Sequence, residues 1–337
     1  MKIAHVRERF APAGAPWRLA AALDASDAPA RWLDLEASRR RAIRDRRVLE
    51  HDSAVHRRSL TTLDDHLAGG LRVEALRDLI DSFVPREEED AAVLDATDLV
   101  FGPPILRPSS MRDFYAFEGH VRTMWDRRGG EVPETWYRLP IFYFSNVSEI
   151  RGPDDPISCP AASGELDYEL EVAALIDTPA IDLPPDRAEE AIGGYTIFDD
   201  WSARDLQREE TVVRLGPAKG KDFASSIGPW LVTPDELATA RRDKGYDLDM
   251  TATVNGTETS RGRWSDAQFS FGDMIARASA DARLRPGDLI GSGTVGTGCL
   301  LEVRDRTLGR YLEPGDEVVL AVERLGRLRN PIVARGS

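Results

Sequence analysis

The sequence predicts a mainly β protein with some helices, the α+β class, in which a smaller N-terminal domain precedes a larger β-rich domain. Short runs rich in Val, Ile, Thr and aromatic residues, separated by Gly, Pro and Asp, gather after residue 104 and are typical of strands. Charged, Ala- and Leu-rich segments before that point favour helices, and the Pro-rich stretch 102–108 is typical of a linker. We therefore expect an N-terminal domain with its linker at 1–104 and a second domain at 105–337.

Within the first domain, a strand is expected at residues 2–6, followed by helices at 35–50 and 71–83. The acidic run 87–90 is expected to be a solvated face or a helix start. In the second domain, helices are expected at 202–209 and from Ser270 onward. Apolar and β-branched runs predict these strands: 166–172, 195–198, 230–232, 250–254, 288–290, 300–303 and 317–322.

Composition narrows the class of protein. The 44 basic and 58 acidic side chains give a formal net charge of -14, which disfavours nonspecific binding to nucleic acid or to anionic membranes. Cys159 and Cys299 are far apart and lack metal-site spacing, which argues against a disulfide framework or a structural zinc site. Residues 1–14 lack the apolar run of a signal peptide, and no later segment has the roughly 20 apolar residues of a membrane span. We expect a cytoplasmic protein.

A row of acids gives the first chemical signal. If residues 166–172 form a strand, side chains alternate between its faces, and Asp167, Glu169 and Glu171 share one face. Like-charged carboxylates repel, and burying one without a partner is costly. Solvent, a basic cluster or a bound metal ion must therefore balance them.

Two glycine-rich segments resemble nucleotide motifs but fail the context test. The segment 291–296 has the glycine pattern of a dinucleotide site, yet the residues after it predict a strand instead of the required helix. The segment 216–222 has glycines one residue too close for a phosphate loop, and Asp222 stands where a magnesium-binding Ser or Thr is needed. Neither segment is expected to bind a nucleotide.

Other polar residues have both a functional and a structural interpretation. Asp200 follows an apolar run and could simply cap a helix. Arg204 and Gln207, three residues apart on one expected helix face, could bind an anionic ligand or lie in solvent. His120 titrates in the range of a general base but needs a second group to orient it, for which Glu302 is a candidate.

The order of these signals resembles the fumarylacetoacetate hydrolase family over about residues 105–325. The landmarks that carry the resemblance are the following: Asp113-Phe114-Tyr115 with His120, Leu166 to Glu171, Asp200 to Gln207, Leu215-Gly216-Pro217 with Gly220-Lys221, Pro229-Trp230, Arg285 to Asp288, Ser292-Gly293-Thr294 and Gly298 to Glu302. The resemblance implies a mixed β-sandwich or β-roll domain after the smaller N-terminal domain. It also implies a homodimer.

The resemblance implies roles for particular side chains. A divalent metal ion would be held by carboxylates, with Mg²⁺ expected first and Ca²⁺ or Mn²⁺ as alternatives, since hard cations prefer oxygen ligands. Asp167 would then support the site from outside it. The implied residues are the metal ligands Asp113, Glu169, Glu171 and Asp200; the catalytic residues His120, Glu302 and Lys221; and the substrate contacts Tyr115, Tyr143, Arg204, Gln207 and Thr294. The family arginine expected shortly after the histidine has no exact counterpart at its spacing, where Gly129 stands, and Arg127 or Arg128, if either, would bind the distal carboxylate of the substrate.

The activity implied by the resemblance is hydrolysis of a carbon-carbon bond in a β-diketo acid, such as fumarylacetoacetate or an acylpyruvate. The same fold could instead support a β-keto acid decarboxylase, or an isomerase or hydratase of an unsaturated keto acid, because a fold does not determine the reaction. A third alternative is a metal- and ligand-binding protein without catalysis. Retention of both His120 and Glu302 favours hydrolysis.

Overall fold

The computed structural model describes residues 1–12, 14–44, 60–84 and 90–336. The expected helix at 35–50 and the acidic run 87–90 extend beyond these ranges, so residues 45–50 and 87–89 lie outside the described part. The helices are α1 (Leu35–Arg44), α2 (Leu63–Ala68), α3 (Arg77–Asp81), α4 (Glu118–Arg127), α5 (Glu134–Arg138), α6 (Pro185–Ala188), α7 (Arg204–Glu210), α8 (Pro234–Leu237), α9 (Phe271–Ser279) and α10 (Leu300–Val303).

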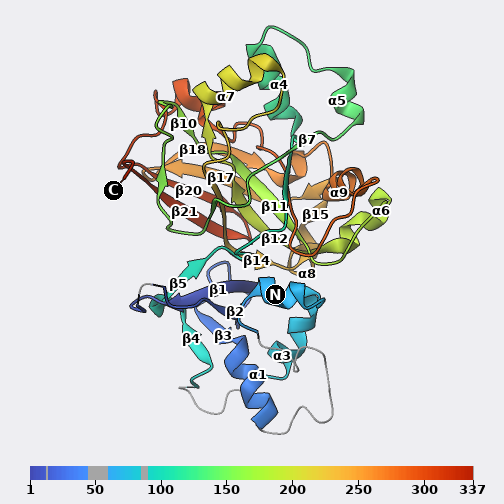
Figure 1. Cartoon of the computed structure of the whole chain (residues 1–337), viewed down its shortest axis with the longest axis vertical. Helices are drawn as coiled ribbons and strands as arrows, with labels where there is room; N and C mark the ends of the chain where they lie inside the picture. The colour runs from blue at the N-terminus through green and yellow to red at the C-terminus, as the bar shows by residue number, and fades with distance from the viewer. Residues whose placement is uncertain (13, 45–59, 85–89, 337) are drawn as a thin grey trace.

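Strands dominate the fold (Figure 1). They are β1 (Lys2–Glu8), β2 (Arg18–Ala22), β3 (Arg31–Asp34), β4 (Val93–Asp95), β5 (Leu99–Gly102), β6 (Met111–Phe114), β7 (Phe142–Phe144), β8 (Ile150–Arg151), β9 (Ile157–Ser158), β10 (Leu166–Asp167), β11 (Leu170–Ile176), β12 (Ile192–Asp199), β13 (Ser202–Ala203), β14 (Ser225–Val232), β15 (Arg241–Arg242), β16 (Gly245–Tyr246), β17 (Asp249–Val254), β18 (Thr257–Arg263), β19 (Leu289–Gly291), β20 (Glu317–Val322) and β21 (Gly326–Val333).

The largest sheet runs β4-β3-β2-β1-β14-β12-β11-β19-β6-β7, with β5 also paired to β1 and β8 to β14. A second sheet runs β18-β17-β20-β21-β9. The N-terminal strands join the largest sheet through antiparallel pairing of β1 with β14, where Lys2 faces Val232. Figure 1 shows the N-terminal strands at one end of the molecule and α4, α5 and α7 at the other. The division into domains at residue 104 stays a prediction.

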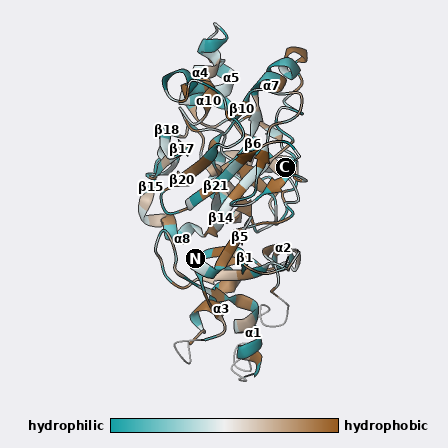
Figure 2. Ribbon diagram, turned by 90° about the vertical axis from the view of Figure 1, so that its left-hand side faces the viewer, coloured by the Kyte–Doolittle hydropathy of each residue, from teal (hydrophilic) through white to brown (hydrophobic). Residues whose placement is uncertain are grey.

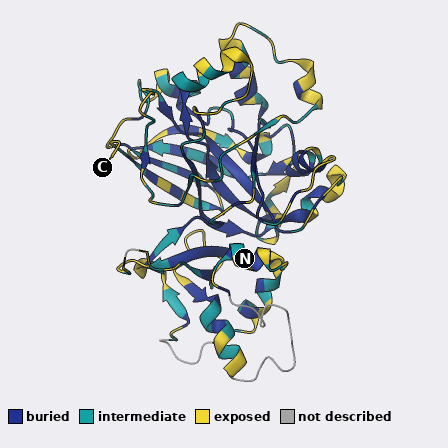
Figure 3. Ribbon diagram, viewed as in Figure 1, coloured by how far each residue is buried: buried dark blue, intermediate teal, exposed yellow. Residues whose placement is uncertain are grey.

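Two cores bury the faces of the central strands. Along β11, Val172 and Ala174 belong to one apolar cluster, whereas Ala173 and Leu175 belong to the other. The second cluster also includes apolar residues of the N-terminal part, such as Ile3. Because both faces of β11 are covered, it is apolar from Val172 to its end instead of alternating with polar residues. Figure 2 shows the hydrophobic residues on the central strands, and Figure 3 shows that these strands are buried while the outer helices carry exposed residues.

The prediction of a mainly β, α+β fold is confirmed. Strands expected at 195–198, 250–254 and 317–322 lie within β12, β17 and β20. The helix expected from Ser270 is α9, whose N-cap is Ser270 in a reciprocal capping box with Asp273. No helix within the described ranges is both long and apolar enough to cross a membrane.

The expectation of one continuous strand at 166–172 is wrong. β10 pairs with β13, whereas β11 pairs with β12 and β19, so the chain changes partners at Tyr168 and Glu169. The carboxylate of Asp199 fixes this break by accepting the backbone N–H of Glu169 at 2.9 Å. Asp167 therefore does not share a strand face with Glu169 and Glu171, and its carboxylate has different partners from theirs.

Two further expectations need correction. Residues 300–303, expected to be a strand, form the short helix α10, because the carboxylate of Asp167 accepts the backbone N–H groups of Leu300 and Leu301 at 2.7 and 2.9 Å. The helix expected at 202–209 begins only at Arg204, because Ser202 and Ala203 pair with β10. Both differences come from contacts between residues far apart in the sequence.

Candidate active site

Strand order brings four acidic side chains from distant parts of the chain to one place. Asp113 lies on β6, Glu171 on β11, and Asp200 directly after β12, and these strands are near neighbours in the largest sheet. Glu169 lies just before β11. All four residues are at most 5% exposed. The four predicted metal ligands therefore lie on or next to neighbouring strands, although they are spread from residue 113 to residue 200.

A glycine-rich segment after β19 makes room for these acids. Gly291 faces Asp113 across the β19–β6 pair, and a side chain at Gly291 would collide with the Asp113 carboxylate. Gly293 has a φ of +78°, which favours glycine, and its backbone N–H donates to Glu171 at 2.9 Å and to Asp113 at 3.2 Å. The segment rejected as a dinucleotide motif thus serves a different purpose, since its glycines let the backbone approach buried carboxylates.

Two buried cations partly balance the acids. The Lys221 ammonium lies 2.6 Å from a carboxylate oxygen of Glu169 and 2.6 Å from one of Asp200. The Arg204 guanidinium pairs with Glu169 at 2.8 Å and with Asp167 at 2.8 Å. Because Arg204 is shared with Asp167, the four clustered carboxylates have fewer positive charges than negative ones.

The excess of negative charge in the acidic cluster affects the pKa values of its carboxyl groups. Burial, together with the charge of Asp200, raises the pKa of Asp113 to about 8. Burial and the nearby Asp113 raise the pKa of Glu171 well above its usual range. Burial also acts to raise the pKa of Glu169, but Lys221 and Arg204 outweigh it and hold that pKa below its usual value. Without further positive charge, some members of this cluster therefore keep protons at neutral pH.

The residues present fit a divalent cation. Carboxylate oxygens of Asp113, Glu169 and Glu171 lie within 4.8 Å of one another. The Oδ1 atom of Asp200 is buried and has no hydrogen-bond partner among the described residues. An all-oxygen donor set with excess negative charge suits hard cations such as Mg²⁺, Ca²⁺ or Mn²⁺. The structure thus contains an acidic cluster able to bind a metal ion.

The predicted His120–Glu302 pair is formed in the structure. His120 is on α4 and Glu302 on α10, and the Nδ1 atom of His120 lies 2.5 Å from Oε1 of Glu302. The other carboxylate oxygen of Glu302 accepts the backbone N–H of Thr297 at 3.0 Å. Because an ionised carboxylate only accepts hydrogen bonds, the His120 proton belongs on Nδ1, and Nε2 keeps its lone pair.

Asp167 connects the two halves of the site. Besides the hydrogen bonds that it accepts from the first turn of α10, it accepts one from Nε of Arg204 at 2.8 Å. The same carboxylate thus positions the helix that carries Glu302 and the arginine that pairs with Glu169. The expected role of Asp167 in supporting the site from outside stays a prediction.

The predicted substrate contacts lie around the same acids. Tyr143 donates a hydrogen bond to Asp200, and Thr294 donates one to Glu171 at 3.3 Å. The Tyr115 ring packs edge-on against His120, with centroids 5.4 Å apart. Gln207 accepts a hydrogen bond from Arg204 at 3.0 Å. These residues are placed to line the site, and their roles toward a substrate stay predictions.

The two arginines considered for the distal carboxylate lie further out. Arg127 ends α4 and Arg128 follows it, and both are exposed. Arg128 lies over the Trp125 ring at 5.9 Å, and its charge lowers the pKa of Tyr115 against the stronger, raising effect of burial. Of these two arginines, Arg128 is the one whose charge acts on Tyr115, and its role toward a substrate stays a prediction.

Three features of the site escaped prediction as functional residues. Gly291 was considered only for nucleotide binding, and Gly293 only there and as a landmark of the family resemblance, although a Gly-Ser-Gly segment directly after a strand was itself a signal of close backbone approach. Asp199, adjacent to Asp200, accepts the backbone N–H of Glu169 but was not among the predicted site residues. Cys299 precedes α10 and is fully buried beside His120 and Glu302.

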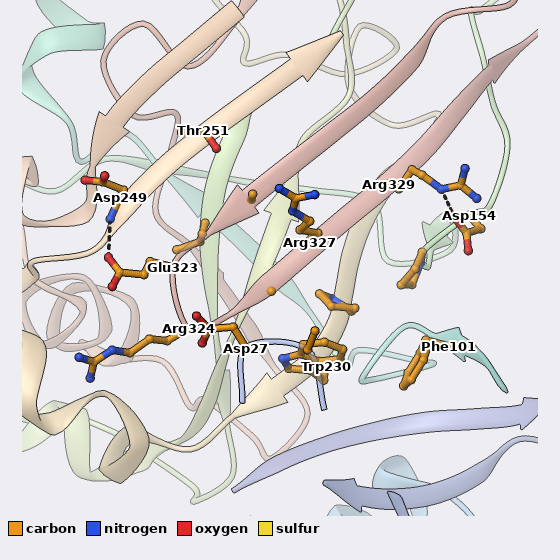
Figure 4. Close-up of a pocket in the computed structure, with 16 residues that line it drawn as sticks. Asp27, Phe101, Asp154, Trp230, Asp249, Thr251, Glu323, Arg324, Arg327 and Arg329 are labelled. Atoms are coloured by element: carbon orange, nitrogen blue, oxygen red, sulfur yellow. Dashed lines mark hydrogen bonds and ion pairs between the residues drawn. The ribbon is translucent and has the colours of Figure 1, made fainter. Parts of the chain in front are cut away.

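A separate groove of about 520 Å³ lies between the N-terminal part and the second sheet (Figure 4). Trp230 and Phe101 line one side of it, and Arg327 of β21 lines the other. None of the predicted site residues lines this groove.

Comparison with known proteins gives the family. The family model described as fumarylacetoacetate (FAA) hydrolase C-terminal matches residues 109–333. This chain belongs to the fumarylacetoacetate hydrolase family. The resemblance inferred from the sequence is therefore confirmed, and the matched range contains every predicted site residue.

Family members of known name include enzymes. A 2,4-didehydro-3-deoxy-L-rhamnonate hydrolase from Sphingomonas sp. (strain SKA58) is 32% identical over 196 residues, which are 57% of this chain and 65% of that protein. A fumarylacetoacetase from Oryza sativa subsp. japonica is 29% identical over 268 residues, with 62% of each chain covered. The matches thus span slightly less than two thirds of either relative.

Solved structures support the fold. The crystal structure of a 5-carboxymethyl-2-hydroxymuconate delta-isomerase from Mycobacterium smegmatis matches with a TM-score of 0.64 and 24% identity. The match covers 99% of this chain and 100% of that one. A protein with this fold is thus named an isomerase, whereas the relatives above are named hydrolases, so the fold alone does not choose the reaction.

Proposed function

We propose that this protein is a hydrolase that cleaves a carbon-carbon bond in a β-diketo acid of the fumarylacetoacetate or acylpyruvate type. The observation that carries the proposal is the buried His120–Glu302 pair beside the acidic cluster. His120 is close enough to the acidic cluster for its charge to lower the pKa of Glu169. A base that activates water is needed for hydrolysis but not for decarboxylation.

His120 acts as the general base. Its Nδ1–H is held by Glu302, so the basic Nε2 atom can accept a proton from water, and Glu302 stabilises the imidazolium that results. The side chain of His120 is 6% exposed and that of Glu302 is 2% exposed. Their attraction is therefore weakly screened, which favours the charged pair as the proton moves.

The acidic cluster and its cations act on the oxygens of the substrate. A divalent metal ion held by Asp113, Glu169, Glu171 and Asp200 would supply concentrated positive charge where the diketo acid develops negative charge. Lys221 is fixed between Glu169 and Asp200, and it adds a second positive charge at that place.

The reaction adds one water molecule across the carbon-carbon bond that breaks. The water oxygen, losing a proton to His120, bonds to the distal carbonyl carbon and gives a tetrahedral oxyanion. Lys221, Arg204 and Gln207 stabilise that charge. The oxyanion collapses, the carbon-carbon bond breaks, and its electron pair leaves as an enolate. Protonation of the enolate carbon returns the proton, and the products are one carboxylic acid and one keto acid.

The test is a product analysis with fumarylacetoacetate and simple acylpyruvates. We expect enol absorbance to fall and two acids to form in the presence of Mg²⁺ or Mn²⁺, and both to stop when a chelator is added. Incorporation of one ¹⁸O atom from labelled water into the released acid identifies water as the nucleophile. Release of carbon dioxide, or an isomerised product without cleavage, would overturn the proposal.

A further inference from the structure

A second group of metal-binding side chains lies beside the acidic cluster. His120, Cys299 and Glu302 each offer one donor atom, and the three atoms lie within 4.8 Å of one another. The Cys299 sulfur is 3.7 Å from the same Glu302 oxygen that approaches His120. None of the four acids of the first cluster belongs to this group.

The donor types differ from those of the acidic cluster. One thiol, one imidazole and one carboxylate form a set that suits zinc-like cations, whereas an all-oxygen set suits Mg²⁺. The backbone supports the arrangement, because Cys299 is the N-cap of α10 and Glu302 is three residues further along its first turn. The Thr297 N–H fixes the other oxygen of Glu302.

We propose that His120, Cys299 and Glu302 form an inhibitory site for Zn²⁺ or a similar thiophilic cation, distinct from the hard-cation site. The inhibitory consequence rests on the proposed function of His120, but the binding itself does not. A metal ion bound to Nδ1 replaces the proton that Glu302 now holds there. That proton moves to Nε2, so the imidazole stays neutral but its basic atom is lost.

One proton is released overall. Burial raises the pKa of the Cys299 thiol well above its usual range, so the thiol is protonated before the metal binds. Coordination converts it to the thiolate and sends its proton to solvent. The His120 proton only changes nitrogen, so one Zn²⁺ should release one proton.

The test uses Co²⁺ as a spectroscopic probe on protein already saturated with Mg²⁺. We expect a thiolate-to-cobalt charge-transfer band in the near ultraviolet, at one per chain, which Zn²⁺ then displaces. The Cys159→Ser variant is the matched control, because Cys159 is the other cysteine and its sulfur donates to the backbone of Ser163 instead. This control should keep the band, and Cys299→Ser should lose it.

The cobalt band provides the first test of the proposed site. The absence of a band in the wild-type protein, or its persistence in Cys299→Ser, would overturn the proposal. If Cys299→Ser proves misfolded by circular dichroism, calorimetric titration of the Mg²⁺-saturated wild-type protein with Zn²⁺ in two buffers decides instead, and release of no proton would overturn the proposal. We also expect Zn²⁺ to lower turnover at least tenfold despite excess Mg²⁺. A cobalt band with undiminished turnover would support the site and refute the proposed role of His120.

Discussion

The two ends of the molecule bury polar groups in different ways. At the end with the acidic cluster, like charges lie close together, and Asp199 and Asp200 each have a buried oxygen without a hydrogen-bond partner among the described residues. At the N-terminal end, the fully buried His5 has a partner on both ring nitrogens. Its Nδ1 donates to the carbonyl oxygen of Pro103 at 2.8 Å, and its Nε2 accepts the backbone N–H of Leu63 at 3.0 Å.

The difference separates a site from a structural contact. Most buried polar groups in proteins are paired, so those left unpaired need an explanation. His5 connects β1, the start of α2 and the residue after β5, and both of its ring nitrogens have hydrogen-bond partners within the protein. The acidic cluster has more negative than positive charge and a buried Asp200 oxygen without a hydrogen-bond partner among the described residues, which makes it a candidate site for a cation.

The largest effect that we expect is on turnover. The His120→Ala variant should lose about 10²–10⁴-fold in kcat, the usual contribution of a general base. It should still bind Mg²⁺, because His120 is not one of the clustered acids. Steady-state kinetics and calorimetric titration with Mg²⁺ measure the two quantities.

The matched control comes from the other end of the molecule. His5→Phe removes another buried histidine and should leave kcat within about twofold, because the hydrogen-bond partners of His5 among the described residues, Pro103 and Leu63, are not residues of the site. If His120→Ala and His5→Phe reduce kcat equally, the contrast between the two ends has no functional meaning.

The second prediction concerns the ion pairs inside the cluster. Lys221→Met leaves Glu169 and Asp200 without their shared cation, and we expect a loss of about 3–5 kcal/mol in the free energy of unfolding without metal. Mg²⁺ should restore part of it, since a bound cation takes over the same charge balance. Urea denaturation with and without Mg²⁺ measures both effects.

Lys219→Met is the control for this experiment. Lys219 is two residues away, but its side chain is 73% exposed and pairs only with Asp222 among the described residues. Its loss should change stability by less than about 0.5 kcal/mol. Equal stability of the two variants in metal-free buffer would contradict the view that Lys221 neutralises buried acids.

The sequence predicted local elements better than the contacts between them. The capping residues Ser270 and Asp273 and the β-branched run in β17 act over a few neighbours, so their helix and strand followed from the sequence. By contrast, the break before β11 depends on Asp199, and α10 depends on Asp167, more than 130 residues earlier. A local sequence pattern does not reveal hydrogen bonds between residues so far apart in the chain.

The site shows the same limit. The acids Glu169 and Glu171 were evident from their spacing, but their meeting with Asp113 depends on strand order. The pairing of His120 with Glu302, across 182 residues, could be expected only from the family resemblance. Cys299 lay within the landmark Gly298 to Glu302, but its distance from Cys159 gave no metal-site spacing, so the sequence did not single it out.

The third prediction concerns the stability of the N-terminal end, where His5 has a hydrogen-bond partner on each ring nitrogen. His5→Phe removes the partners of the Pro103 carbonyl and the Leu63 N–H, and each buried group left unpaired costs about 1–3 kcal/mol. We expect a lower midpoint of urea denaturation at neutral pH, with Mg²⁺ present and absent alike. A loss that Mg²⁺ reverses would instead connect His5 to the acidic cluster.

The smallest effect is the pH dependence of His5. Burial lowers its pKa below the ordinary 6.5, although the Pro103 carbonyl, Asp64 and Asp65 act to raise it. The unfolded chain therefore binds a proton near pH 6.5 that the folded chain refuses, because a protonated Nε2 could not accept the Leu63 N–H. The stabilisation is complete above about pH 6.5 and is lost as the pH falls below it, by at most about 1.4 kcal/mol per pH unit.

This dependence is best measured as a difference between two proteins. The His5→Phe variant has no proton to take up at that position, while the carboxylates other than Asp64 and Asp65 titrate alike in both proteins and cancel. The stability gap between wild type and variant should therefore narrow as the pH is lowered from about 7 to about 5. A constant gap would mean that His5 binds its proton equally well in the folded and unfolded chain, and that its paired nitrogens do not hold the ring neutral.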